Sequence, residues 1–165
     1  MSAYSSHHDQ LRATLGRHDM WLEQPSAELW EARRQWFEEL DESLAGDGSY
    51  LVSEQACALI GEVETAFCAG AWVAVLVLAL AVVDAQLRET ELPGFTGNIR
   101  QLLDAAEANP ELQRLRERRN AIIHIDPENP AITVDQQWKN RTELEQEARQ
   151  AVRLMFEAFY IGPWV

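Results

Sequence analysis

The side chains best suited to act on a phosphate group lie near the end of one predicted helix, residues 112–124. Arg119 falls on a stripe of that helix that is otherwise apolar, where a hydrophobic side chain would be expected. Asn120 and His124 follow on a second line of the helix. Arginine presents a permanently charged fork of donors that suits phosphate, and histidine exchanges protons near neutral pH. These three residues form the candidate catalytic group.

Three further arginines, Arg114, Arg116 and Arg118, make the same helix strongly cationic. The whole chain carries a net charge of −13, which repels nucleic acid and anionic membranes at long range. A site for a polyanion must therefore be a local patch held against that background. Arg116 and Arg118 could hold phosphates of such a ligand, or they could be solvated charges that pair with glutamates.

The longest uncharged stretch of the chain, residues 66–83, determines the fold class. Gly70 is expected to interrupt it, which leaves residues 71–83 continuously apolar, well short of the about 20 residues of a membrane span. The flanks also lack the basic bias and the paired interfacial aromatics of a spanning helix. We therefore expect a helix over residues 71–91 that is apolar all round and surrounded by other helices, with no membrane involved.

Apolar residues recur at helical spacing in most of the remaining chain. Besides the central helix, the predicted helices are a weak one at 9–22 and others near 26–44, 53–67, 99–106, 110–124 and 142–159. Residues 131–134 are the one plausible strand, too short to alter the fold class, and Thr142 with Glu145 has the spacing of a capping box at the start of the last helix. Short connections between so many helices predict an all-α, up-and-down bundle of about six helices.

The length of 165 residues suits a single domain, 1–165, with a helical extension at 1–50 and a bundle core at 52–160. Cys57 and Cys68 fall on one predicted helix, about 16 Å apart, so they are not expected to form a disulfide. The N-terminus shows no targeting signal, so we expect a cytoplasmic protein with reduced thiols. The sequence indicates neither a metal site nor a cofactor.

The run Arg119-Asn120-Ala-Ile-Ile-His124 resembles the motif of the HEPN superfamily, in which an arginine, often beside a polar residue, is followed after a short spacer by a histidine. Residues 66–84 resemble the superfamily's helix-turn-helix rich in small residues, with Asp84 where an acidic residue commonly ends the apolar stretch. Together the resemblance covers about residues 52–160.

This resemblance implies a helical bundle that dimerises so that two copies of the motif face one cleft. Many members are metal-independent endoribonucleases that act as toxins, in antiviral defence or in RNA processing, and an antitoxin-like protein partner would fit such a role. In that reading two His124 side chains serve as base and acid, Arg119 holds the phosphate, and Asn120 orients His124 or the ribose. Arg116 and Arg118 would bind neighbouring phosphates of the RNA, and Asp84 would support the site.

Structural interpretations of the same residues stay open. Arg119 could form an ion pair with Asp84, His124 could cap the end of its helix, and Asn120 could satisfy a loop carbonyl. The chain could then be a noncatalytic HEPN-like interaction or nucleotide-sensing module. A further alternative is an acidic helical adaptor protein outside the superfamily.

Overall fold

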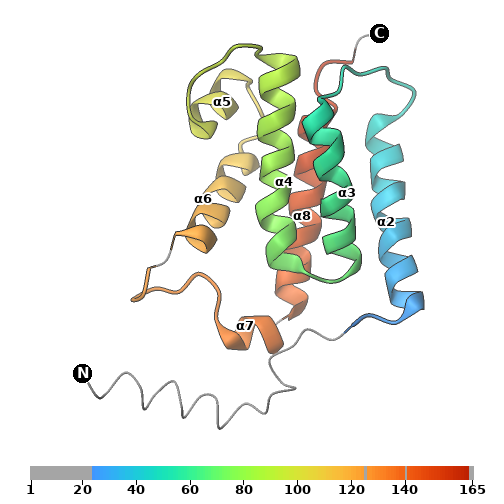
Figure 1. The fold of residues 1–165 in the computed structure, drawn as a ribbon, viewed down its shortest axis with the longest axis vertical. Helices are drawn as coiled ribbons and strands as arrows, with labels where there is room; N and C mark the ends of the chain where they lie inside the picture. Colours follow the sequence, from blue (N-terminus) through green and yellow to red (C-terminus); the bar gives the residue numbers. More distant parts are fainter. Residues whose placement is uncertain (1–23, 125, 140, 164–165) are drawn as a thin grey trace.

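The structure, a computed structural model, describes residues 24–124, 126–139 and 141–163, and every regular element there is helical (Figure 1). The elements are α2 (Ala27–Ala45), α3 (Glu54–Cys68), α4 (Trp72–Gln86), the π-helix η2 (Leu87–Glu91), α5 (Ile99–Ala105), α6 (Glu111–Ile123), α7 (Val134–Trp138) and α8 (Arg141–Phe159). The predicted all-α bundle is confirmed. The weak helix predicted at 9–22 lies outside the described residues. None of the described helices has the length and hydropathy that crossing a membrane requires.

Side-chain caps begin the helices near the predicted places. The Ser26 hydroxyl accepts a hydrogen bond from the backbone N–H of Leu29 at 3.2 Å, and the Ser53 hydroxyl accepts one from Ala56 at 3.1 Å. Such caps satisfy backbone N–H groups that have no partner within the helix. The N-termini of α2 and α3 are therefore determined locally by the sequence.

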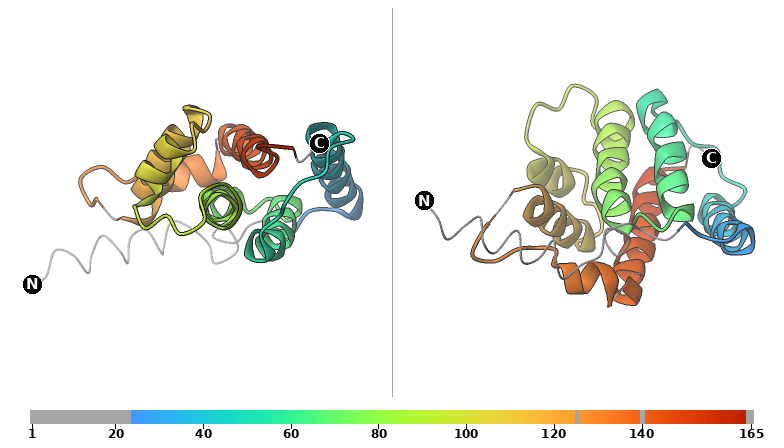
Figure 2. Two further views of the ribbon diagram at one scale, coloured as in Figure 1. Left: turned by 90° about the horizontal axis from the view of Figure 1, so that it is seen from above. Right: turned by 60° about the horizontal axis from the view of Figure 1, so that its bottom comes forward.

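The central helix α4 packs against α3, α6 and α8 (Figures 1 and 2). Its side toward these neighbours is fully buried at Val75, Ala79 and Val82. Its opposite side, however, is only half-buried along a line that we call the open stripe, formed by Val73, Ala74, Val77, Leu78 and Ala81. The expectation that other helices surround α4 is therefore met on the sides of α3, α6 and α8, and only in part along the open stripe, where Leu78 still packs against the core.

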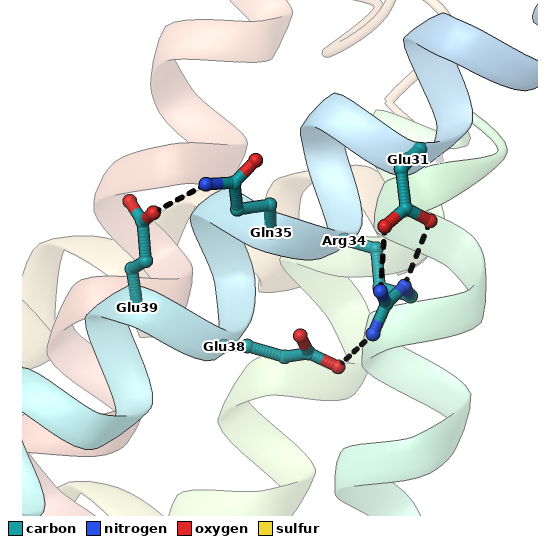
Figure 3. Close-up of polar contacts among 5 residues, drawn as sticks. All are labelled: Glu31, Arg34, Gln35, Glu38 and Glu39. Atoms are coloured by element: carbon teal, nitrogen blue, oxygen red, sulfur yellow. Dashed lines mark hydrogen bonds and ion pairs between the residues drawn. The ribbon is translucent and has the colours of Figure 1, made fainter.

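α2 packs on α3 and α8, and its Phe37 and Leu40 are buried in the same core as α4. Its outer face is polar: Figure 3 shows Arg34 bonded to both Glu31 and Glu38, and Gln35 bonded to Glu39. Exposed pairs of this kind contribute little to stability. The division of the chain at residue 50 stays an interpretation.

The last turn of the predicted central helix is a π-helix rather than an α-helix. In η2 the N–H of Leu92 bonds to the carbonyl of Leu87, five residues back, and the Thr90 hydroxyl donates to the carbonyl of Gln86. Gln86 itself is buried, and its amide bonds to the backbone of Leu51, Ser53 and Phe159. π-turns often occur at functional sites because the wider turn changes where the next side chains point.

Two local predictions near the last helix are wrong. Residues 131–134 form no strand, because the Thr133 hydroxyl caps α7 and forms a reciprocal capping box with Gln136. Thr142 does not cap α8, which already begins at Arg141, and Glu145 instead bonds to Arg149. The Thr-x-x-Gln pattern was the missed helix signal.

The predicted break at Gly70 is confirmed, since its φ is +72°. An ideal Cβ at this position would lie 2.9 Å from Nη1 of Arg33, which donates to the carbonyl of Cys68 at the end of α3. We expect Gly70→Ala to lower the free energy of unfolding by at least about 1–2 kcal/mol, the cost of a left-handed conformation for alanine. Urea unfolding measures this.

Gly61 supplies a matched control for that substitution. It lies inside α3, and a Cβ added there would meet only open space, so Gly61→Ala should raise the free energy of unfolding by about 0.5–1 kcal/mol. Equal effects of the two substitutions would contradict the described turn.

The end of α8 is tied to α2 by a hydrogen bond from the Tyr160 hydroxyl to Oδ1 of Asp41. Burial and then this bond raise the pKa of Tyr160 above its ordinary value. The unfolded chain therefore loses this proton first, near pH 10. The contribution to stability is fully present below that pH and is lost as pH rises through the folded pKa.

We expect the free energy of unfolding to decline above about pH 10 and to decline less steeply in Tyr160→Phe. Urea titrations from pH 7 to 11 on both chains measure the difference. Parallel curves would show that Tyr160 is not the group responsible.

Candidate active site

Arg119 lies on α6 with its side chain half-buried at the wall of a pocket of about 250 Å³. We call this cavity the Arg119 pocket. Its walls come from α3, α4, η2, α5 and α6, and its lining residues are Gln55, Leu80, Ala81, Asp84, Ala85, Arg88, Glu89, Ile99 and Arg119. Arg119 and Asp84, both predicted site residues, are therefore brought to one cavity.

The guanidinium of Arg119 has hydrogen-bond donors that no described residue satisfies. Its Nη1 donates to Oδ1 of Asn120 at 3.1 Å, while its Nε is buried and has no hydrogen-bond partner among the described residues. Its Nη2 also makes no hydrogen bond with another described residue and is not buried, so an acceptor from a ligand could bind there. The ion pair with Asp84 that the sequence allowed does not form.

Asp84 pairs with Arg88 instead, with 2.9 Å between Oδ1 and Nε. Arg88 also donates to the carbonyls of Phe95 and Gly97, each at 3.0 Å, so it fastens the turn before α5 to the end of α4. This pair is a structural clamp at the pocket wall. Asp84 and Arg88 stand four residues apart, a spacing typical of helical ion pairs, and that pattern could have identified the clamp from sequence.

His124 ends α6 as its C-cap, with its backbone N–H bonded to the carbonyl of Asn120 and its side chain exposed. It does not line the Arg119 pocket. His124 follows Arg119 by five residues, which corresponds to roughly 140° around a helix, so the two side chains diverge. The side chain of Asn120 bonds to Arg119 and not to the His124 side chain. One chain therefore does not gather the whole predicted catalytic group.

The other cationic residues of α6 have carboxylate partners. Nε of Arg118 lies 2.7 Å from Oε2 of Glu147 on α8, and its Nη1 donates to the carbonyl of Ala131. Arg116 bonds to Gln113 and pairs with Glu117, and Arg114 pairs with Glu111.

Within the described chain, Arg119 is thus the member of the cluster that makes no ion pair. The binding of phosphates by Arg116 and Arg118 stays a prediction. The partner of Arg118 on α8 is distant in sequence, so the sequence did not identify it.

Protein-family models, curated proteins and solved structures contain no match to this chain. The resemblance to the HEPN superfamily therefore rests on residues 119–124 and on the small-residue stretch that ends at Asp84.

Proposed function

We propose that this chain is a HEPN-like endoribonuclease that acts as a homodimer and needs no metal ion. The observation that carries the proposal is the uncommitted guanidinium of Arg119 in a pocket beside Asp84, with the exposed His124 at the end of the same helix. A cation set to receive an anion and an accessible imidazole are the two groups that RNA cleavage requires.

In the proposed reaction, the 2′-oxygen of a ribose attacks the adjacent phosphorus and the bond from phosphorus to the 5′-oxygen breaks. One His124 takes the 2′ proton, and the His124 of the second chain gives a proton to the leaving 5′-oxygen. Arg119 stabilises the extra negative charge on the phosphorane, and Asn120 holds the guanidinium in place. The products are a 2′,3′-cyclic phosphate and a 5′-hydroxyl.

The open stripe of α4 supports the dimer. It is a half-buried apolar surface on the central helix, and Ala81 belongs both to it and to the Arg119 pocket. A two-fold dimer pairs the same patch on each chain, so packing along this stripe would bring both pockets toward one another. The second chain would then supply the histidine that one chain does not place beside its own Arg119.

A noncatalytic HEPN-like module is the second candidate. It is favoured by the glutamate partners of Arg114, Arg116 and Arg118, which leave little free positive charge for RNA on a chain of net charge −13. A toxin, defence or RNA-processing role, with or without an antitoxin-like partner, is a proposal that depends on catalysis.

Cleavage of mixed-sequence RNA in the presence of EDTA tests the function. The proposed enzyme releases fragments with 2′,3′-cyclic phosphate ends, and EDTA leaves the rate unchanged. A folded chain that cleaves no RNA would favour the noncatalytic module, and cleavage abolished by EDTA would contradict the proposed mechanism.

A further inference from the structure

The Arg119 pocket has a chemical character that the cleavage reaction alone does not require. Besides Arg119 and the ion pair of Asp84 with Arg88, its lining contains the exposed carboxylate of Glu89 and the amide of Gln55. The side chains of Glu89 and Gln55, and Oδ2 of Asp84, make no hydrogen bond with another described residue. The pocket therefore offers free acceptors next to the uncommitted guanidinium of Arg119.

The shape of the pocket limits what can enter. A volume of about 250 Å³ falls just below the about 300 Å³ at which sites for drug-sized ligands begin, so it suits one small group. Leu80, Ala85 and Ile99 supply an apolar wall. Arg88 neutralises Asp84 within this lining, so Glu89 is the carboxylate there without a cationic partner among the described residues. A group with N–H donors would satisfy Glu89 and the free oxygen of Asp84, while a phosphate attached to it would lie at Arg119.

Among the four RNA bases, guanine meets this requirement best. Its Watson–Crick edge places two donors, N1–H and N2–H, side by side, which matches the two oxygens of a carboxylate. Uracil presents one N–H between two carbonyls, and adenine and cytosine each present an amino group beside an acceptor. Single-stranded RNA is usually read in this way, on the edges of unstacked bases.

We infer that the Arg119 pocket binds the guanine base of a guanylate whose phosphate contacts Arg119, with Glu89 and the free oxygen of Asp84 as acceptors. The inference rests on the proposed function, because it makes this guanine a neighbour of the cleaved phosphate. Glu89 reaches the pocket from η2, so the π-turn after α4 would serve to position a specificity residue.

Calorimetric titration of the full chain with guanosine, adenosine, cytidine and uridine monophosphates tests this assignment. Guanosine monophosphate should bind at least about five-fold more tightly than the others, the lower end for a bidentate contact to a base edge. Glu89→Gln keeps the size of the side chain and should remove that preference. Ala81→Leu should fill the pocket without changing its charge and weaken binding of guanosine monophosphate.

Asp47→Asn is the matched control, since Asp47 is an exposed acid outside the pocket, and it should leave binding unchanged. Equal binding of the four nucleotides, or binding of none at millimolar concentration, would overturn the inference. Cleavage of RNA is measured separately: selective binding without cleavage would reject only the enzyme, and cleavage with no guanine preference would reject only the guanine pocket.

Discussion

Replacement of His124 by alanine is expected to slow RNA cleavage by about two to four orders of magnitude, the usual contribution of general acid–base catalysis. The proposed mechanism removes the 2′ proton and protonates the 5′-oxygen with this side chain on both chains, so the variant loses both steps. His124 is exposed at the end of α6, and its one described hydrogen bond comes from the backbone. The fold should therefore survive the substitution.

Initial rates on one defined RNA substrate measure the effect, with the thermal midpoint recorded for each protein. Glu128→Ala is a suitable control because Glu128 is also exposed and lies in the loop that follows α6. Both variants should melt like the original chain, and only His124→Ala should lose cleavage. An unchanged rate in His124→Ala would exclude this residue from the mechanism.

Aspartate at two positions of α4 that lie about one helical turn apart should have opposite effects on folding. Val75 is fully buried, so Val75→Asp places a carboxylate in the core without a partner, at a cost of several kcal/mol. That is comparable with the whole stability of a small domain, and the chain should lose its cooperative fold. Leu78 lies on the open stripe, so Leu78→Asp should fold but should no longer dimerise.

Circular dichroism during thermal unfolding reports the fold, and sedimentation velocity at micromolar concentration reports the oligomeric state. A folded Val75→Asp chain would contradict the described core. A Leu78→Asp chain that remains dimeric would move the interface away from the open stripe.

Much of this fold follows from local signals in the sequence. Ser26 and Ser53 cap helices where their side chains predict it, and Gly70 breaks the apolar stretch because it adopts a positive φ. The direction of burial around α4 could not be predicted. A helix that is apolar on every side carries no periodicity, so the partial burial of Leu78 depends on where α3, α6 and α8 pack.

The candidate site was predicted only in part, because its residues come from several helices whose packing the sequence does not specify. Arg119 stood out because it interrupts an apolar stripe, and the structure places it at a pocket with Asp84. Gln55 and Glu89 reach that pocket from other elements, and neither the packing of α3 on α4 nor the π-turn has a local sequence signal that identifies them. The separation of His124 from the pocket depends on where α6 ends.

In the proposed enzyme, the active site is shared between two chains. Arg119→Ala and His124→Ala proteins each lack one residue in both copies, so each should be nearly inactive alone. In a mixed dimer, the shared cleft keeps one Arg119 and one His124. The decisive measurement is the cleavage rate of the two variants after they are unfolded together and refolded.

If the site is shared, this mixture should cleave RNA at least about ten-fold faster than the sum of the two separate variants, because either residue alone contributes more than that to the rate. A site built within one chain would regain nothing, since no chain in the mixture carries both residues. A rate equal to the sum of the parents, under conditions where native mass spectrometry shows mixed dimers, would contradict the shared site.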